Sequence, residues 1–458
     1  MSFGNNKKKE PTMRMNRLLS LTLTGCLVFC VSCSVTYESK KTTLIEKGAK
    51  EMNTRMNRNR LNIGTYFLRP YACSEAHVKD LADCGIDFVV CMQNDPKTLD
   101  LFTKYNVGAI VTGILPGWWG GDGDNAGTMR EKNPWSAYEK GAASFKDHPA
   151  IWGIDTGDEP SALDFPYYGE VLKFVEKNFP KQFPYLNLYP NYASVAKNNA
   201  QQTVNQLGTP TYAEHIDRYC ENIAADYICY DFYMYSASVA GHYENLRIVA
   251  DACRKSGRSL WIVLQVNSNK ADKWISENQL RIQAYSSMAF GAENIIWACY
   301  TAGWWHNQVL DDKGNKTQQY DKLKAVNAEL HALSDEYMRF RNASTHFVGF
   351  KADSPWLAKL QNTKPLEALN TGVFRDVKAA NGAELIIGQM VSRKADGSYA
   401  LMVCAADDPQ DTANKTFDVT FRCDDFKVKA VGAPLTKLAD GSYSISMKSC
   451  GGALIVAE

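Results

Sequence analysis

The sequence predicts an α/β fold, a (β/α)8 TIM barrel followed by a small C-terminal β-sandwich. Two patterns carry this prediction. Between residues 61 and 340, eight short apolar runs alternate with amphipathic helical segments, and from residue 345 to 458 only short runs separated by turns remain. The 458-residue chain is long enough for two such domains. A doubly wound open sheet is the alternative for the first domain, but no glycine-rich phosphate loop follows its first strand.

The eight apolar runs are expected to form parallel strands, each followed by a helix on the outside of the barrel. We expect strands at 62–68, 87–92, 108–115, 151–156, 185–189, 227–233, 260–266 and 294–300. We expect helices at 75–84, 96–104, 135–145, 168–178, 212–223, 243–255, 277–290 and 318–338. The active site of such a barrel lies at the carboxyl ends of its strands.

The C-terminal part shows strand-length runs and turn signals without a helical period. The runs lie at 384–388, 399–404, 417–421, 442–446 and 452–456. The sequence Ala-Asp-Gly-Ser occurs at 395–398 and again at 439–442, which indicates two tight turns with glycine in an unusual backbone conformation. We expect this β-sandwich to pack against the barrel, with carbohydrate binding as a second possibility.

The N-terminus resembles the signal peptide of a bacterial lipoprotein. Basic residues up to Arg17 precede an apolar stretch that ends in Val31-Ser32-Cys33, and Cys33 is the expected lipidation site. Cys26, after Leu23-Thr24-Gly25, is the alternative. Residues 1–33 are therefore expected to be a signal peptide and the lysine-rich 34–60 a tether, which places the protein at the cell envelope. An uncleaved membrane anchor is the other interpretation.

Charge and cysteine spacing exclude several functional classes. The 51 basic and 50 acidic residues give a net charge of +1, so nothing favours binding to nucleic acid or to an anionic membrane surface. The cysteines after the signal peptide form no CxxC pair and no metal-binding spacing with histidine, and we expect neither a metal nor another cofactor. If the protein is exported, disulfides can form; Cys423 and Cys450 are the candidate pair to test, although the sequence does not determine the connectivity. Cys91, Cys229 and Cys299 are expected to be buried thiols.

The fourth predicted strand ends in a concentration of carboxylates. Asp155, Asp158 and Glu159 close an otherwise apolar run, and Pro160 stops the strand because it cannot donate to a sheet. Regular alternation would place Asp155 and Glu159 on one face and Asp158 on the other. The alternative is that these acids merely cap the helix that begins near Phe165.

Aromatic and amide side chains dominate the other strand ends. Amides and carboxylates bond sugar hydroxyls while aromatic rings cover the apolar face of a sugar, so this combination predicts a site for a neutral carbohydrate. The expected substrate-binding residues are Tyr66, Trp118, Trp119, Asp155, Asn187, Tyr189, Tyr233, Gln265, Asn267, Tyr300 and Trp304.

Three segments resemble barrel glycoside hydrolases of the large retaining clan that includes families 5 and 42. They are the strand ending 152–160, the triplet Asp231-Phe232-Tyr233 and the segment 291–297. The resemblance implies that Glu159 is the general acid/base, with Asp158 in the place of the clan's asparagine. It also implies a second glutamate, the nucleophile, at the end of the seventh strand.

The sequence departs from that clan at Gln265, since an amide cannot form the glycosyl ester. Three hypotheses follow. Asp231 could act as base across a water, at the roughly 6.5–9.5 Å carboxyl separation of inverting enzymes. Alternatively, an N-acetyl group of the substrate could attack, as in family 18-like barrels. The third hypothesis is a catalytically inactive carbohydrate-binding lipoprotein. We expect an exported glycoside hydrolase with Glu159, Asp231 and Asp158 as its catalytic residues.

Overall fold

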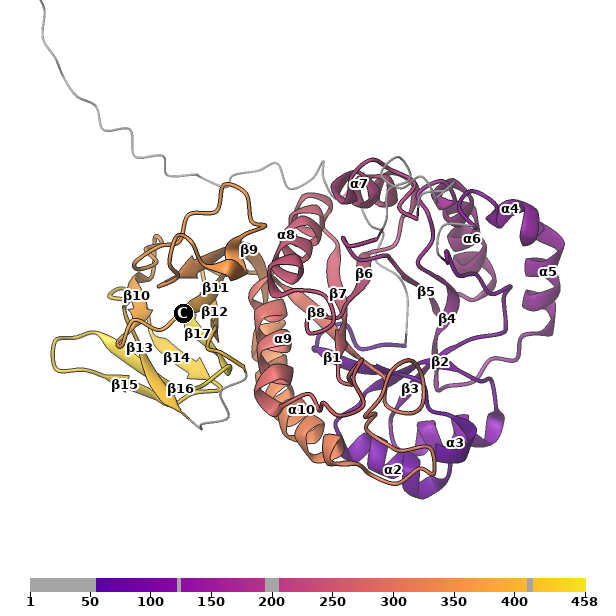
Figure 1. Cartoon of the computed structure of the whole chain (residues 1–458), viewed down its shortest axis with the longest axis horizontal. Coiled ribbons are helices and arrows are strands. Elements are labelled where there is room, and N and C mark those ends of the chain that lie inside the picture. The colour runs from indigo at the N-terminus through magenta and orange to yellow at the C-terminus, as the bar shows by residue number, and fades with distance from the viewer. Residues whose placement is uncertain (1–54, 122–124, 194–205, 410–414) are drawn as a thin grey trace, which may run out of the picture. The chain divides into compact units, whose positions relative to one another are not determined.

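The computed structural model describes residues 55–121, 125–193, 206–409 and 415–458 (Figure 1). The predicted signal peptide, the lipidation site at Cys33 and nearly all of the tether lie outside the described residues. Within the described part of the chain, no helix has both the length and the apolar character needed to cross a bilayer.

Eight parallel strands form the barrel that the sequence predicted, with helices around it (Figure 1). The ladder order is β5-β4-β3-β2-β1-β8-β7-β6, and a bridge between Leu188 and Tyr230 joins the two end strands. The fifth strand begins earlier and the third ends earlier than predicted. The strands are β1 (Asn62–Tyr66), β2 (Phe88–Met92), β3 (Gly108–Val111), β4 (Ile151–Asp158), β5 (Phe183–Asn187), β6 (Tyr227–Phe232), β7 (Ser259–Gln265) and β8 (Ala292–Ala298).

The helices begin where side chains satisfy their free backbone N–H groups. Ser74 and Asp95 cap the helices that start at Glu75 and Pro96, and Thr211 and Ser276 form full capping boxes. The short α4 was not predicted. The helices are α2 (Glu75–Asp83), α3 (Pro96–Lys104), α4 (Met129–Lys132), α5 (Trp135–Ser144), α6 (Phe165–Asn178), α7 (Tyr212–Asn222), α8 (Val239–Ser256), α9 (Glu277–Ala289) and α10 (Gln318–Tyr337), with short 3-10 turns η1 (Pro70–Ala72) and η3 (Pro355–Leu357).

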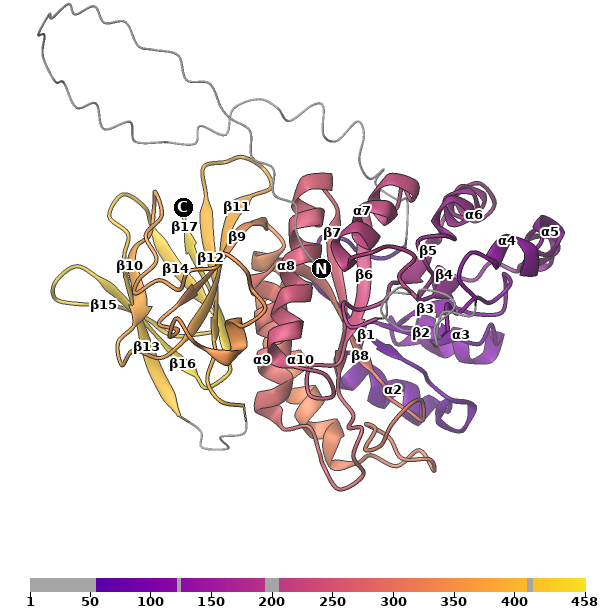
Figure 2. The same ribbon diagram turned by 45° about the horizontal axis from the view of Figure 1, so that its top comes forward.

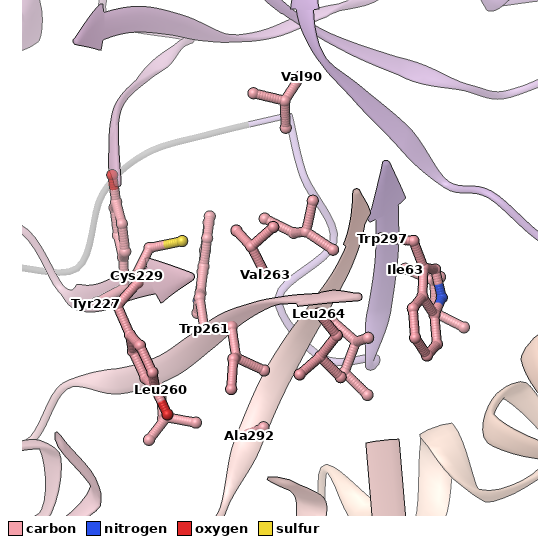
Figure 3. Close-up of a cluster of buried hydrophobic side chains, with 14 of the residues drawn as sticks. Ile63, Val90, Tyr227, Cys229, Leu260, Trp261, Val263, Leu264, Ala292 and Trp297 are labelled. Carbon is pink, nitrogen blue, oxygen red and sulfur yellow. The ribbon is translucent and has the colours of Figure 1, made fainter. Parts of the chain in front are cut away.

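Large side chains fill the barrel interior near the amino ends of the strands. Trp261 stacks on Tyr227 with ring centroids 4.2 Å apart (Figure 3). Its ring also meets Phe183 edge-on, with ring centroids 5.5 Å apart. Arg58, from the segment before β1, lies over the Trp261 ring and pairs with Asp226 at 3.2 Å. This end of the barrel is therefore occupied by protein, which leaves the carboxyl ends of the strands for a site.

The C-terminal domain is a sandwich of two antiparallel sheets, as predicted (Figure 2). One sheet has the order β10-β13-β16-β15 and the other β14-β17-β12-β11-β9. Both Asp-Gly turns form, with Asp396 accepting from Ser398 N and Asp440 from Ser442 N. The strands are β9 (Phe340–Val348), β10 (Arg375–Ala379), β11 (Leu385–Ser392), β12 (Tyr399–Ala405), β13 (Thr416–Arg422), β14 (Val428–Val431), β15 (Leu435–Lys437), β16 (Tyr443–Lys448) and β17 (Gly452–Ala457).

The five-stranded sheet packs closely against α9 of the barrel. A Cβ at Gly388 would lie 2.2 Å from the Ala289 carbonyl oxygen, so only glycine permits this approach. Asn342 and Thr345 donate to the same oxygen at 2.9 and 3.0 Å. The two domains therefore share one continuous apolar core.

The predicted disulfide between Cys423 and Cys450 is wrong. Both are free thiols. Cys423 follows β13 and lies in the core between the two sheets, whereas Cys450 precedes β17 and belongs to the core shared with the barrel. Two thiols in separate cores cannot be bridged without moving the backbone.

Candidate active site

The loop after β3 lies directly against the end of β4 and shapes the site. Gly120 N donates to the Asp158 carbonyl at 3.0 Å, and Asp158 N donates to the Trp118 carbonyl at 2.9 Å. A Cβ at Gly120 would lie 1.6 Å from the Glu159 carbonyl oxygen, so the loop can dock only with glycine there. Glu159 itself has φ 47° and donates its N–H to the Asn187 carbonyl at 2.8 Å. The chain thus turns sharply at Glu159, which projects its carboxyl group at the rim.

A β-bulge in β4 corrects the predicted orientation of the acids. The pairing with β5 shifts register between Asp155 and Gly157, and Gly157 has φ 139°. A Cβ at Gly157 would lie 2.1 Å from the Tyr168 hydroxyl. Because the bulge breaks the alternation, Asp155 and Asp158 line the same cavity instead of opposite faces. These acids also do not cap α6, whose N-cap residue is Asp164.

Asp158, Glu159 and Asp231 form a group that we call the carboxyl cluster. Asn187 links two of its members, since its side-chain N–H2 donates to Asp158 Oδ1 at 3.1 Å and to Asp231 Oδ1 at 2.9 Å. The Glu159 side chain also acts on Asp231, because hydrogen bonding from Glu159 lowers the pKa of the Asp231 carboxyl group. Trp119 Nε1 donates to Glu159 Oε2 at 3.0 Å. Side chains from β4, β5, β6 and the loop after β3 therefore meet at one point.

Burial and mutual repulsion make this cluster retain protons. Burial raises the pKa of Asp158 well above its usual range, the charges of Glu159 and Asp155 raise it further, and the Asn187 hydrogen bond opposes them. Burial and the charge of Asp158 raise the pKa of Asp231 to about 7, against the hydrogen bonds from Asn187 and Glu159. Near neutral pH at least one proton remains within the cluster.

A cavity of about 320 Å³ lies beside the carboxyl cluster at the ends of β1 to β5. Hydroxyl groups of Tyr66 and Tyr185 meet across it at 2.9 Å. Asp155 is held by three donors, with Gly157 N at 3.1 Å, the Cys91 thiol at 3.7 Å and the Thr112 side chain. Burial nevertheless raises the pKa of Asp155. The lining residues are Tyr66, Cys91, Thr112, Leu115, Gly117, Trp118, Trp119, Asp155, Gly157, Asp158 and Tyr185.

Aromatic rings extend from the cavity across the top of the barrel. Trp304 packs against Tyr66 at 5.6 Å and against Tyr233 at 5.9 Å between ring centroids. Tyr192 is 51% exposed, and its pKa is raised by burial and then by the charges of Asp231 and Glu159. Tyr192 and Trp119 thus present rings to solvent near the carboxyl cluster.

Four predicted substrate-binding residues instead support the loops or the core. Gln265 accepts from Tyr235 N at 3.0 Å and donates to Ser236 Oγ and the Asn267 carbonyl, so its amide is fully bonded within the protein. Asn267 donates to the Trp304 carbonyl at 2.6 Å. The remaining two residues, Tyr189 and Tyr300, do not line the cavity either. The Tyr189 hydroxyl donates to the Gly121 carbonyl. Tyr300 is fully buried, and the ionisable groups near its hydroxyl include Cys84 and Tyr320.

Several lining residues were not predicted as part of a site. Cys91 was expected to be a buried thiol, but it faces the cavity, and Tyr185 was assigned to the start of a strand. Both positions lie on barrel strands whose boundaries the sequence leaves uncertain. Leu115 and Thr112 follow β3, so a shorter third strand would have placed them at the rim. Within the described residues, no group of three or more His, Cys, Asp or Glu side chains is arranged to hold a metal ion.

Comparison with known proteins gives no family for the chain. No family model matches it, and no curated protein matches it. Among solved structures it is similar to a glucosidase from Croceicoccus marinus, at 8% identity over 90% of this chain and 97% of that one, with a TM-score of 0.41. A GH128 endo-β-1,3-glucanase from Sorangium cellulosum has 14% identity over 58% of this chain and 98% of that one, with a TM-score of 0.39. A glycoside hydrolase family 5 mannosidase from Rhizomucor miehei has 12% identity over 62% of this chain and 95% of that one, with a TM-score of 0.38. With TM-scores below 0.5, no activity is transferred from these proteins.

Proposed function

We propose that the protein is a glycoside hydrolase in which Glu159 donates a proton to the departing glycosidic oxygen. The observation that carries the proposal is the setting of this carboxyl group. It follows β4 at the carboxyl end of the barrel and is hydrogen-bonded to Trp119 and to Asp231, whose pKa is about 7. Cleavage of a glycosidic bond needs a proton on the leaving oxygen, and a carboxylic acid that stays protonated near neutral pH supplies it.

Within this proposal Asp231 and Glu159 have different roles in proton transfer. Asp231 is 4% exposed and holds the proton away from bulk water, while Glu159 is half-buried and is the member of the pair that reaches a substrate. Asn187 fixes Asp231 from the other side through its side-chain amide. The proton passes from the pair to the departing glycosidic oxygen through Glu159, and the pair becomes anionic. A water molecule then adds to the anomeric carbon and gives its proton back to the pair, which completes hydrolysis.

The contact between the two carboxyl groups changes the role expected for Asp231. An inverting pair keeps its carboxyl groups roughly 6.5–9.5 Å apart so that a water fits between them. The electrostatic influence of Glu159 on Asp231 favours a closer arrangement. The wide separation stays a prediction, and we propose for Asp231 the role of proton partner of Glu159.

Carbohydrate is the substrate class that best fits the surroundings of Glu159. The rings of Tyr66, Trp118 and Trp119 line the cavity and offer flat apolar faces, and the carboxyl groups of Asp155 and Asp158 offer acceptors for hydroxyl groups. Pockets for small ligands are usually lined by many apolar and aromatic side chains and by a few polar groups, as this cavity is.

We also propose that the protein is exported and anchored to the cell envelope through a lipid on Cys33, as the N-terminal sequence indicates. Growing the expressing cells with labelled palmitate tests this. The wild-type protein should carry the label and sediment with membranes, whereas Cys33→Ala should lose both properties. A label that persists in Cys33→Ala would refute the assignment of this cysteine.

The test of the proposed activity is a comparison of wild type with Glu159→Gln on a panel of aryl glycosides and oligosaccharides. Glu139→Gln, an exposed glutamate on α5, is the matched control. We expect turnover by the wild type and the control and a loss of about 10²–10⁴-fold in Glu159→Gln, the usual contribution of a general acid. Sugar binding by the wild type without turnover of any glycoside would instead support the inactive carbohydrate-binding protein.

A further inference from the structure

The charges that line the cavity are all of one sign. Its ionisable lining residues are Asp155 and Asp158, together with phenols and a thiol whose pKa values burial raises. None of the lining residues is Lys, Arg or His. Lys132 and Arg69 are basic side chains whose contacts lie outside the lining residues or on the Trp118 ring. Lys132 lies 5.9 Å from the Trp118 ring and donates to Asn125, and Arg69 stacks on Phe67 and donates to the Ala302 carbonyl.

The Asp155 carboxyl group accepts several hydrogen bonds, which oppose the rise in its pKa that burial causes. Its carboxyl group receives hydrogen bonds from a backbone N–H, a hydroxyl and a thiol, all of which favour the ionised form. The protein supplies donors that hold the anion in place, yet no cation of the described chain lines the cavity to balance it. A carboxylate withdrawn from water without a cationic partner is costly, and a ligand that carries the positive charge removes that cost.

The other walls of the cavity also favour a cation. Tyr66, Tyr185 and Trp118 line it, and the faces of aromatic rings attract an ammonium group. Trp118 is 8% exposed, and its indole N–H has no hydrogen-bond partner among the described residues. The polar side chains that line the cavity for a sugar ring are the carboxyl groups of Asp155 and Asp158 and the hydroxyl groups of Thr112, Tyr66 and Tyr185.

We infer that the cavity binds a sugar ring that carries a free amino group, a hexosamine unit, and that Asp155 is the residue that selects it. The inference rests on the proposed function, because it names the ring that the hydrolase holds beside Glu159. Asp155 pairs with the ammonium, the aromatic walls cover the ring, and a uronic acid is rejected since its carboxylate would face Asp155 and Asp158.

A binding experiment tests the inference apart from any turnover. Affinities of the full-length protein are measured by isothermal titration or ligand-observed NMR for matched free sugars at pH 6.5. Each set consists of a hexosamine, its parent hexose, its N-acetyl derivative and its uronic acid, in the gluco, galacto and manno configurations. In at least one configuration we expect the hexosamine to bind about tenfold or more tightly than the other three, as one ion pair predicts. Asp155→Asn, which keeps the shape of the side chain, should remove the preference while Asp217→Asn, an exposed change on α7, should keep it.

The outcomes are distinct. Equal affinity for hexosamine and hexose, a preference for a uronic acid, no binding of any member of the sets, or a preference that survives in Asp155→Asn would each overturn the inference. If binding follows the expected order but no hexosaminide is cleaved by the wild type, the hydrolase proposal fails and the selective site remains.

Discussion

Replacing Asp231 by Asn removes the buried proton of the carboxyl cluster without changing the shape of the side chain. The carbonyl oxygen of the new amide can still accept from Asn187. The folded protein raises the pKa of Asp231 from 3.8 to about 7, chiefly by burial and then by the charge of Asp158. The wild type therefore binds a proton more tightly when folded than when unfolded, and Asp231→Asn abolishes this difference.

The sign of the effect on stability follows from that difference. A group whose pKa is raised by folding contributes stability that is fully present below pH 3.8 and is lost as the pH rises through about 7. At about 1.36 kcal/mol for each tenfold change in proton affinity, the loss is of the order of 4 kcal/mol. Relative to Asp231→Asn, the wild type should therefore lose stability between pH 4 and pH 8, and the variant should have the flatter profile.

The assay is urea unfolding of the wild type and of Asp231→Asn at several pH values from 4 to 8, followed by tryptophan fluorescence. Asp217→Asn is the control, because it removes an exposed carboxylate on α7. We expect the difference in unfolding free energy between wild type and Asp231→Asn to change by several kcal/mol over this range, and the control to run parallel to the wild type. Parallel profiles for all three proteins would refute the claim that Asp231 holds its proton to near neutral pH.

Three further predictions concern the residues that shape the site. Gly157→Ala should destabilise the fold by about 2–5 kcal/mol, because φ is 139° at this position and the added Cβ would clash with the Tyr168 hydroxyl. Adding Tyr168→Phe removes only the clash and should recover about 1–2 kcal/mol of the lost stability. Urea unfolding measures both variants, and no recovery in the double variant would contradict this geometry. Gln265→Glu should not raise turnover, and it should lower the free energy of unfolding by about 1–3 kcal/mol, because the Gln265 amide is hydrogen-bonded to neighbouring loops. A gain in glycosidase rate would mean that this position faces the substrate. Trp119→Phe keeps an aromatic ring but loses the hydrogen bond to Glu159. We expect kcat/KM to fall about tenfold or more, while the affinity for the free sugar changes little. An unaffected kcat/KM would show that this hydrogen bond has no role in proton donation.

The barrel could be predicted from the sequence because its signals are local. Alternating apolar runs and amphipathic segments repeat over 61–340, and caps such as Ser74 and Asp95 mark the starts of helices. The concentration of acids at the end of the fourth strand also stood out, and three of the residues expected to be catalytic meet in one cluster.

What the sequence did not reveal depends on backbone irregularities and on long-range packing. A one-residue bulge at Gly157 brings Asp155 and Asp158 to one cavity, and no alternation rule anticipates it. Gln265 sits at a strand end as expected, but loop contacts after β6 and β7 engage its amide. The expected disulfide failed for the same reason, because sequence spacing does not say which of two cores a thiol enters.

The most direct test of the account is the pH dependence of glycoside turnover in wild type and Glu159→Gln, with Glu139→Gln as control. We predict that kcat/KM of the wild type and the control falls above about pH 7, where Asp231 loses its proton, and that kcat/KM of Glu159→Gln stays about 10²–10⁴-fold below the wild type at every pH below 7. Turnover by Glu159→Gln at the wild-type rate, with the same pH profile, would contradict the assignment of Glu159 as the proton donor.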